Sequence, residues 1–450
     1  MMGSKNSVAT RFNQMCPGIF ILKCICHSAH LCASEACKQI PRSCEDMARN
    51  IFNFLHSSAK RQSTLKQFQL FMDLKPKKIL HPSQTRWLSL EAVVNRILEQ
   101  WEALRLYFND TYLDQKLFST EQIYNSLNDK FIKLYFFFLA WILPKFNEFN
   151  KYFQTQKVVI NDLHDKIRLL YQEILLSFLK RNYVMQNDLS SVRPDNGEHH
   201  LPDSQLYLGA QVLKYINVPE LANKNVEKKH FFKSCRYFLQ TAALELKKRY
   251  NMDDPVLSKL PSLSAKNALS IEYHDSHPTL VPLISLMTRI VPENNVELIQ
   301  KIDDQWRSLP LKIMHMPDSI TNLQYANGSA DIFWSNIKDY DIKTEAIGQE
   351  LPDFALSVLC LPHSNADCER IFSSVNAIKT KYRNKLITET INGTILTKEC
   401  IKGGRSQTKN CVNFVPSKLM INRMTSNTLY PKKEISSENI SLKVLGLCNL

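Results

Sequence analysis

The segment Phe131–Phe153 constrains the fold of this chain more than any other. It is apolar on nearly every side of a helix, and its centre is the run Leu134-Tyr-Phe-Phe-Phe-Leu-Ala-Trp-Ile-Leu143. Such a helix is buried on all sides, so other helices must surround it. The run is too short to cross a bilayer of about 30 Å, and Lys133 and Lys145 bracket it. We therefore predict the central helix of a helical domain rather than a membrane segment.

Helical periodicity extends over most of the chain. Glycine is scarce, with 10 residues among 450, whereas Phe and Tyr number 23 and 16. Low glycine and long segments rich in Leu, Phe and Lys are typical of mainly helical proteins. Apolar residues are 44% of the sequence, which is enough for a sizeable core. Helices are predicted over 27–37, 41–72, 91–108, 131–153, 159–179, 227–249, 281–306 and 331–337, with an exposed loop at 185–205.

One short segment, Gly18-Ile-Phe-Ile-Leu-Lys-Cys-Ile-Cys26, predicts a buried β-strand because it is apolar and rich in β-branched residues. Cys24 and Cys26 would then share one face of the strand, next to His27 and His30. Their spacing is not that of paired zinc ligands. We predict buried thiols at these positions and no metal site.

The chain is strongly basic. Its 57 Lys and Arg residues exceed its 43 Asp and Glu residues, which gives a formal net charge of +14 and a pI of about 9.1. This balance favours contact with a polyanion, and nucleic acid is the first candidate. Residues 1–15 lack the apolar run of a secretory signal, so the 12 Cys are expected to be mostly free thiols in a reducing compartment.

Two basic segments are candidates for nucleic-acid contact. Arg86 and Trp87 stand at the predicted start of a helix, where the indole could stack on a base and the guanidinium could meet a phosphate. The same Trp could instead attach the start of the helix to the core. Further on, a helix carrying Ile378, Tyr382 and Leu386 is predicted. Its two i, i+4 basic rows are Lys381 with Lys385 and Lys379 with Arg383.

The stretch Leu361–Ser374 predicts a tight polar turn followed at once by a helix. Asn365, Ala366 and Asp367 supply the start signals. Glu369 falls in the first turn, where an acid interacts favourably with the positive end of the helix dipole. By itself the stretch is an ordinary capped helix. Its predicted apolar face consists of Ile371, Phe372 and Val375.

Three blocks occur in order along the chain. Cys26–Leu31 (Cys-His-Ser-Ala-His-Leu) follows the predicted strand, and Thr85–Ser89 (Thr-Arg-Trp-Leu-Ser) opens a helical region. Ser364–Ser373, followed by Arg383–Leu386, closes that region. Together the blocks resemble the hAT superfamily of DNA transposases and their domesticated, BED-finger-type relatives. The resemblance extends over residues 1–400.

The resemblance implies a fold that is mainly α. In the family, an RNase H-like α/β core is split by a large all-helical insertion, and C-terminal helices form a dimerisation region. By this resemblance the chain keeps an incomplete RNase H-like α/β core remnant, interrupted by the insertion. The implied parts are a core remnant at 1–72 (strand 18–26 plus helices), the all-helical insertion at 73–340, and the RNase H-like helix and dimerisation region at 341–402. The polar sequence after Gly403-Gly404 predicts a disordered tail at 403–450.

The family's catalytic site has three acids, Asp-Asp-Glu, and Glu369 matches the third. Two-metal phosphoryl transfer needs several carboxylates, so one Glu cannot perform it. The family's second Asp precedes a Met-x-Gly segment that Met2-Gly3-Ser4-Lys5 resembles, and the first Asp of this chain is Asp46. We therefore expect a catalytically inactive protein with a vestigial Glu369 and no cofactor; Mg²⁺ would be needed only by an intact family member. The alternative is the C-terminal part of an active DNA transposase.

The expected function is protein dimerisation, with the chain itself as partner in a homodimer or higher oligomer. DNA is a second expected partner, while a membrane and a small-molecule substrate are not expected. An active nuclease, a nucleic-acid-binding module and a decayed reading frame stay open as alternatives. The nucleus, or otherwise the cytoplasm, is the expected location. The dimerisation residues are Phe354, Leu356, Leu359, Phe372, Val375, Leu386, Ile391 and Ile395, and the nucleic-acid residues are Arg86, Trp87, Lys379, Lys381, Arg383 and Lys385.

Overall fold

The computed structural model describes residues 7–82, 90–115, 118–317, 320, 329–344, 347–402 and 411–426. Within these ranges the chain is helical, and the one β-type contact is an isolated antiparallel bridge between Leu179 and His200. The predicted mainly α fold is thus confirmed, while the RNase H-like remnant stays a prediction. No helix of the described ranges is both long enough and apolar enough to span a membrane.

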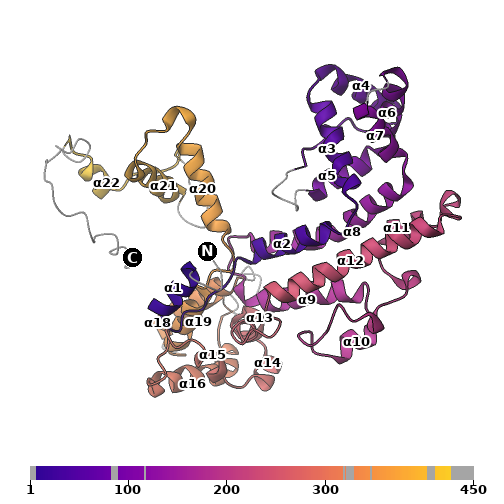
Figure 1. The fold of residues 1–450 in the computed structure, drawn as a ribbon. Helices are drawn as coiled ribbons and strands as arrows, with labels where there is room; N and C mark the ends of the chain where they lie inside the picture. Colours follow the sequence, from indigo (N-terminus) through magenta and orange to yellow (C-terminus); the bar gives the residue numbers. More distant parts are fainter. Residues whose placement is uncertain are drawn as a thin grey trace. The chain divides into compact units, whose positions relative to one another are not determined.

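Contacts divide the chain into two compact units, residues 1–367 and residues 368–450, which we call the N-terminal and C-terminal units. Figure 1 shows their helices. The N-terminal unit begins with α1 (Val8–Met15), α2 (Ile25–Cys37), α3 (Arg42–His56), α4 (Ala59–Phe71), α5 (Leu90–Glu99), α6 (Trp101–Gln115), α7 (Phe118–Asn128) and α8 (Lys130–Phe153). It continues with α9 (Leu163–Leu176), α10 (Arg181–Gln186), α11 (Ala210–Tyr215), α12 (Asn225–Arg249), α13 (Ala265–Ala268), α14 (Ile271–Ser276), α15 (Val281–Ile284), α16 (Val296–Ile313), α18 (Ala330–Thr344) and α19 (Glu350–Leu359).

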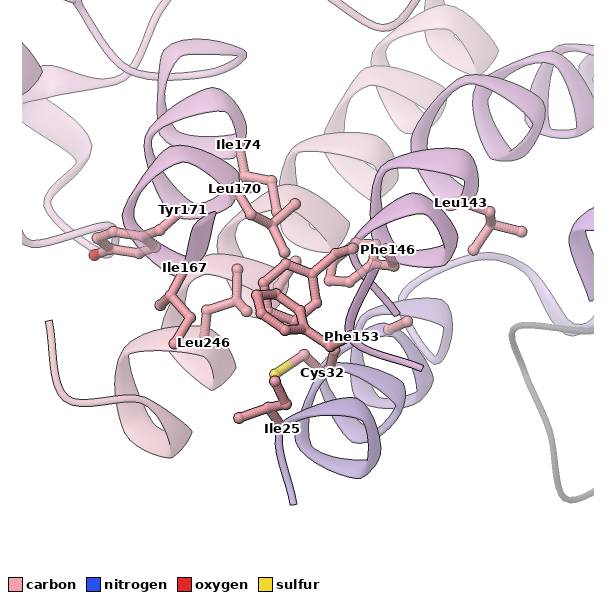
Figure 2. Close-up of a cluster of buried hydrophobic side chains, with 14 of the residues drawn as sticks. Ile25, Cys32, Leu143, Phe146, Phe153, Ile167, Leu170, Tyr171, Ile174 and Leu246 are labelled. Atoms are coloured by element: carbon pink, nitrogen blue, oxygen red, sulfur yellow. The ribbon is translucent and has the colours of Figure 1, made fainter. Parts of the chain in front are cut away.

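Helix α8 is the centre of the N-terminal unit, as its sequence predicts. The Asp129 carboxylate accepts a hydrogen bond from Phe131 N at 2.8 Å and caps the helix. Neighbours contact α8 along its length, among them α2, α5, α11 and α12. Figure 2 shows Phe146 and Phe153 of α8 among side chains of α9, with Ile25 of α2 close by. Each fully buried side chain of this kind contributes roughly 1.5–3 kcal/mol to folding.

The predicted strand at residues 18–26 is wrong. Residues 19–24 have no regular secondary structure, and Ile25 already begins α2 with Cys24 as its N-cap residue. The structure offers this segment no partner strand in the described ranges, and the Ile25 carbonyl accepts a hydrogen bond from Tyr250 Oη at 2.6 Å. Ile25 is buried, so the apolar run ends in a helical core and not in a sheet.

Because the predicted strand is absent, Cys24 and Cys26 do not share a strand face. Cys26 Sγ lies on α2 and contacts the Asn150 carbonyl at 3.8 Å, while His27 and His30 stack with their ring centroids 6.5 Å apart. Cys24 and Cys26 are half-buried, and Cys32 further along α2 is fully buried. Burial raises the pKa of the Cys32 thiol to about 12, which keeps it protonated.

Most predicted helices are present, with changes at their boundaries. The predicted segment 41–72 forms two helices, α3 and α4, separated at Ser57 and Ser58. The segment 91–108 is divided between α5 and α6 at Gln100. The predicted loop 185–205 contains two short 3₁₀ turns, and Leu189 and Val192 in it are buried rather than exposed.

The last helices of the N-terminal unit are held by buried hydrogen bonds. α19 packs against α16 and α18. Asp341 on α18 is buried and accepts hydrogen bonds from the Ile347 and Gly348 amides at 2.6 and 3.0 Å. Gly348 has a φ of +101°, and a Cβ there would lie 2.2 Å from Gln305 Nε2. Gln305 in turn accepts a hydrogen bond from Leu351 N at 2.8 Å, so this junction has little room for change.

Helix α14 contains a buried histidine. His274 Nε2 lies 3.0 Å from the Ala268 carbonyl, to which it donates, and the ring stacks on Trp306 with centroids 4.0 Å apart. Nδ1 is buried without a hydrogen-bond partner, so the neutral ring fits this site. Burial lowers the pKa of His274 below its ordinary value, although the Ala268 carbonyl and Asp275 act in the opposite direction.

The C-terminal unit has less regular structure. Helix α20 (Ala366–Ile378) enters it, and a 3₁₀ turn (Lys381–Arg383), α21 (Thr388–Lys402) and α22 (Lys418–Arg423) follow. The predicted continuous helix through Ile378, Tyr382 and Leu386 is wrong, because α20 ends at Ile378 and Thr380 is extended. The predicted disordered tail 403–450 contains α22, whereas residues 403–410 and 427–450 lie outside the described residues.

Replacing Asp341 by Ala should destabilise the N-terminal unit. The substitution leaves two amides without their acceptor, one of them buried, at a cost of about 2–3 kcal/mol in the free energy of unfolding. Asp339→Ala, at an exposed site on the same helix, is the matched control and should change it by less than about 0.5 kcal/mol. Denaturant unfolding followed by circular dichroism checks this, and equal effects of both variants would contradict the role of Asp341.

His274 should make the N-terminal unit less stable in acid. Because its folded-state pKa lies below the unfolded value of 6.5, the unfolded state takes up the proton first. This contribution to stability is present above pH 6.5 and is lost as the pH falls below it. His274→Gln keeps a donor for the Ala268 carbonyl but cannot titrate. Melting curves at pH 7.5 and pH 5 should show a larger drop for the wild type than for His274→Gln; identical drops would show that His274 is not responsible.

Candidate functional site

The turn and helix predicted at Leu361–Ser374 are confirmed. Helix α20 begins at Ala366, whose amide donates to Ser364 Oγ at 3.4 Å. Glu369 lies in the first turn of α20 and is exposed. The Ser373 hydroxyl donates a hydrogen bond to the main-chain carbonyl of Glu369 at 3.0 Å. This bond lies within the helix and does not involve the Glu369 carboxylate.

A two-metal centre needs more donors than the described residues bring together. No group of three or more His, Cys, Asp or Glu side chains in the described ranges is arranged to hold a metal ion. Glu369 is exposed, so it is not part of a buried set of carboxylates. Within the described part of the C-terminal unit, Glu369 therefore lacks the further carboxylates that a two-metal site requires.

The predicted dimerisation residues separate into two groups. Phe354 and Leu359 of α19 are 2% and 3% exposed and belong to the core of the N-terminal unit, and Leu356 is half-buried beside it. Phe354 and Leu359 therefore pack inside their own chain and offer no free surface to a partner. In the C-terminal unit, Ile391 is buried, and Val375, Leu386 and Ile395 are half-buried.

Phe372 stands apart because it is large, apolar and 67% exposed. It lies on α20 with Ile371, which is 52% exposed, and with half-buried Val375 one turn further on. The exposed Cys368 precedes Phe372 by four residues, so these side chains form one row along the helix, which we call the α20 row. The sequence predicts this face as apolar, but its exposure is visible only in the structure.

The C-terminal unit exposes further apolar side chains. Tyr382 is 99% exposed, and Ile387 and Leu396 are each more than 60% exposed. On α22, Leu419, Met420 and Ile421 are exposed as well. Exposed apolar side chains that gather in one surface patch often mark an interaction site.

The predicted nucleic-acid residues fall in two places. Arg86 and Trp87 lie outside the described residues. Lys379, Lys381, Arg383 and Lys385 are all exposed, in and beside the 3₁₀ turn rather than in two helical rows. No acid occurs between residues 379 and 388, and none of the four forms an ion pair with a described residue.

A groove lies between α3, α4 and the segment Lys75–Ile79. The sequence alone shows this segment only as a basic connection interrupted by proline. The groove has a volume of about 620 Å³. We call it the basic groove. Its lining residues are Phe52, Leu55, His56, Gln62, Ser63, Leu65, Lys66, Gln69, Pro76, Lys77, Lys78 and Ile79. The charge of this part of the chain is the signal that could have drawn attention to it.

Comparison with known proteins leaves the fold without a match: no protein-family model matches the chain, and no solved structure matches it.

Proposed function

We propose that this chain is a transposon-derived protein of the hAT type that associates with itself through its C-terminal helices and does not cleave DNA on its own. The observation that carries the proposal is the exposure of Cys368, Ile371 and Phe372 in the α20 row, since these three residues lie within the block Ser364–Ser373 that resembles the family. In the family the corresponding region is a dimerisation region.

The α20 row has the properties of one half of a symmetric helix pair. Cys368, Ile371, Phe372 and Val375 are spaced i, i+3, i+4 and i+7, the spacing of a seam between packed helices. In a two-fold dimer the same patch faces itself, so each apolar side chain counts twice. Burying one exposed Phe contributes roughly 1.5–3 kcal/mol, so a few such side chains per chain supply a useful part of the binding free energy.

The non-catalytic part of the proposal depends on the carboxylates. Within the described part of the C-terminal unit, Glu369 is not accompanied by the other donors of a two-metal site. An exposed Glu in the first turn of a helix also has a structural role, since its charge interacts favourably with the helix dipole. We therefore assign Glu369 to the start of α20 and not to catalysis.

Phe372→Asp should weaken self-association by tenfold or more, because a carboxylate would be buried against its own copy. Sedimentation equilibrium at about 1–50 µM measures this, and wild-type protein should be dimeric or larger across that range. Ser373→Asp places the same charge on the exposed neighbouring position of α20, outside the row, and should leave the association constant within about twofold. A wild-type chain that sediments as a monomer at 50 µM would contradict the proposal.

DNA contact is a second candidate, favoured by one observation. Lys379, Lys381, Arg383 and Lys385 expose four positive charges within seven residues, with no acid among them. Such a segment suits the phosphate backbone, which supplies affinity without reading sequence. It lies next to the α20 row in the chain, so one unit would carry both properties.

Binding of a DNA duplex should weaken with salt. Contacts from four basic side chains give a slope of about −3 to −4 in a plot of log K against log salt concentration. The double substitution Lys381→Ala/Arg383→Ala should reduce that slope by about half. The exposed Lys266→Ala is the matched control and should not change it.

Two results would contradict the proposed function, the first its DNA contact and the second the role of Glu369. A binding constant independent of salt would exclude phosphate contact. Cleavage of the duplex in Mg²⁺ that Glu369→Gln abolishes would contradict the non-catalytic assignment of Glu369.

A further inference from the structure

We propose that the basic groove binds an acidic peptide segment of a partner protein and takes one of its apolar side chains onto the groove floor. This inference is independent of the dimerisation proposal, since it concerns α3, α4 and the segment Lys75–Ile79. The basic groove has a volume of about 620 Å³, which lies within the range of ligand-binding clefts in proteins.

The floor of the groove is apolar. Leu55 and Leu65 are buried beneath it, and Phe52, Pro76 and Ile79 are half-buried at its sides. An aliphatic or aromatic side chain placed there would exchange water contact for these neighbours. The apolar floor is therefore the part of the groove that would bind the apolar side chain of the peptide.

The rim of the groove is basic. Residues 57–82 hold six Lys or Arg residues and one acid, Asp73, and the described residues that line the groove include no carboxylate. Lys66 and Lys78 are exposed on the rim and form no ion pair with a described residue. Lys77 differs, because it pairs with Glu99 on α5 and holds the pKa of that carboxyl below its usual range. Lys66 and Lys78 are thus the charges that face a ligand, and they favour an acidic one.

Both walls of the groove are fixed before any ligand arrives. Gln69 Nε2 on α4 donates to the Lys77 carbonyl at 2.9 Å, and Arg96 on α5 donates to the Lys78 carbonyl. Gln62 Nε2 on α4 donates to the Leu55 carbonyl on α3 at 3.2 Å. A ligand that enters this groove therefore pays little for ordering the protein, which favours binding by a short segment.

The aromatic groups favour a peptide over single-stranded nucleic acid. A base needs the open face of an aromatic ring to stack on. The Phe52 ring is stacked by His56 at a centroid distance of 5.0 Å and is met by His81 at 4.6 Å in an edge-on contact. The floor is aliphatic, so the groove offers apolar depth and positive charge, and the Phe52 ring presents no open face to a base.

The probe is a fluorescein-labelled dodecapeptide of Asp and Glu with two Leu residues four positions apart. Fluorescence anisotropy should show binding to the full chain, and replacing both Leu by Ser, or all acids by their amides, should weaken it about tenfold or more. Lys66→Glu/Lys78→Glu should weaken binding by a similar factor. Ser63→Trp, which fills the groove from an exposed position without a change of charge, should do the same.

Lys214→Glu/Lys266→Glu carries an equal charge change on exposed sites of α11 and α13 and should leave the affinity within about twofold. Circular dichroism spectra of all variants should match that of the wild type, because the altered side chains are exposed. Three outcomes would overturn the proposal: no peptide binding by the wild type at 100 µM, equal binding by the groove variants, or weakening of labelled oligo-dT binding by these variants without an effect on the peptide.

Discussion

The burial of α8 is the constraint on which the N-terminal unit depends. Its side chains at Leu134, Phe138, Ile142 and Phe146 are fully buried, while Glu148 and Lys151 near its end are exposed. A helix with so many buried apolar side chains is stable only when α2, α5, α9 and α12 pack against it. One continuous hydrophobic cluster consequently extends from Ile25 to Leu359, across segments far apart in the sequence.

Periodicity predicts what depends on local pattern and fails where tertiary contact decides. The long helices around Phe138 and Phe238 were predictable because their apolar residues recur at helical spacing over many turns. The strand at 18–26 could not be excluded, since a short apolar run suits either a strand or the start of a buried helix. In the structure, Ile25 is in a helix whose first carbonyl accepts a hydrogen bond from the Tyr250 hydroxyl. These residues are 225 positions apart, so the local sequence cannot predict their contact.

The candidate sites show the same division. The turn and helix at Leu361–Ser374 follow from start signals within a few residues, and the structure has them. Exposure does not follow from pattern: Phe354 and Phe372 are both apolar helical residues, yet one is buried in the core and the other is exposed. Only the charge of the basic groove could be predicted from the sequence. Its shape could not, because its walls come from three segments held together by side-chain hydrogen bonds to the carbonyls of Lys77 and Lys78.

The pairing of α2 with α12 has a consequence for biosynthesis. Ile25 leaves the ribosome 225 residues before Tyr250, the residue that completes its hydrogen bond. At roughly 5–20 residues per second, the interval is about 10–45 s. During that time Ala29, Cys32 and Ala33 lack the helix that later covers them, and α8 emerges with its apolar sides uncovered. During synthesis the first helices thus expose an apolar surface for that interval, which is the condition under which nascent chains aggregate unless they are protected.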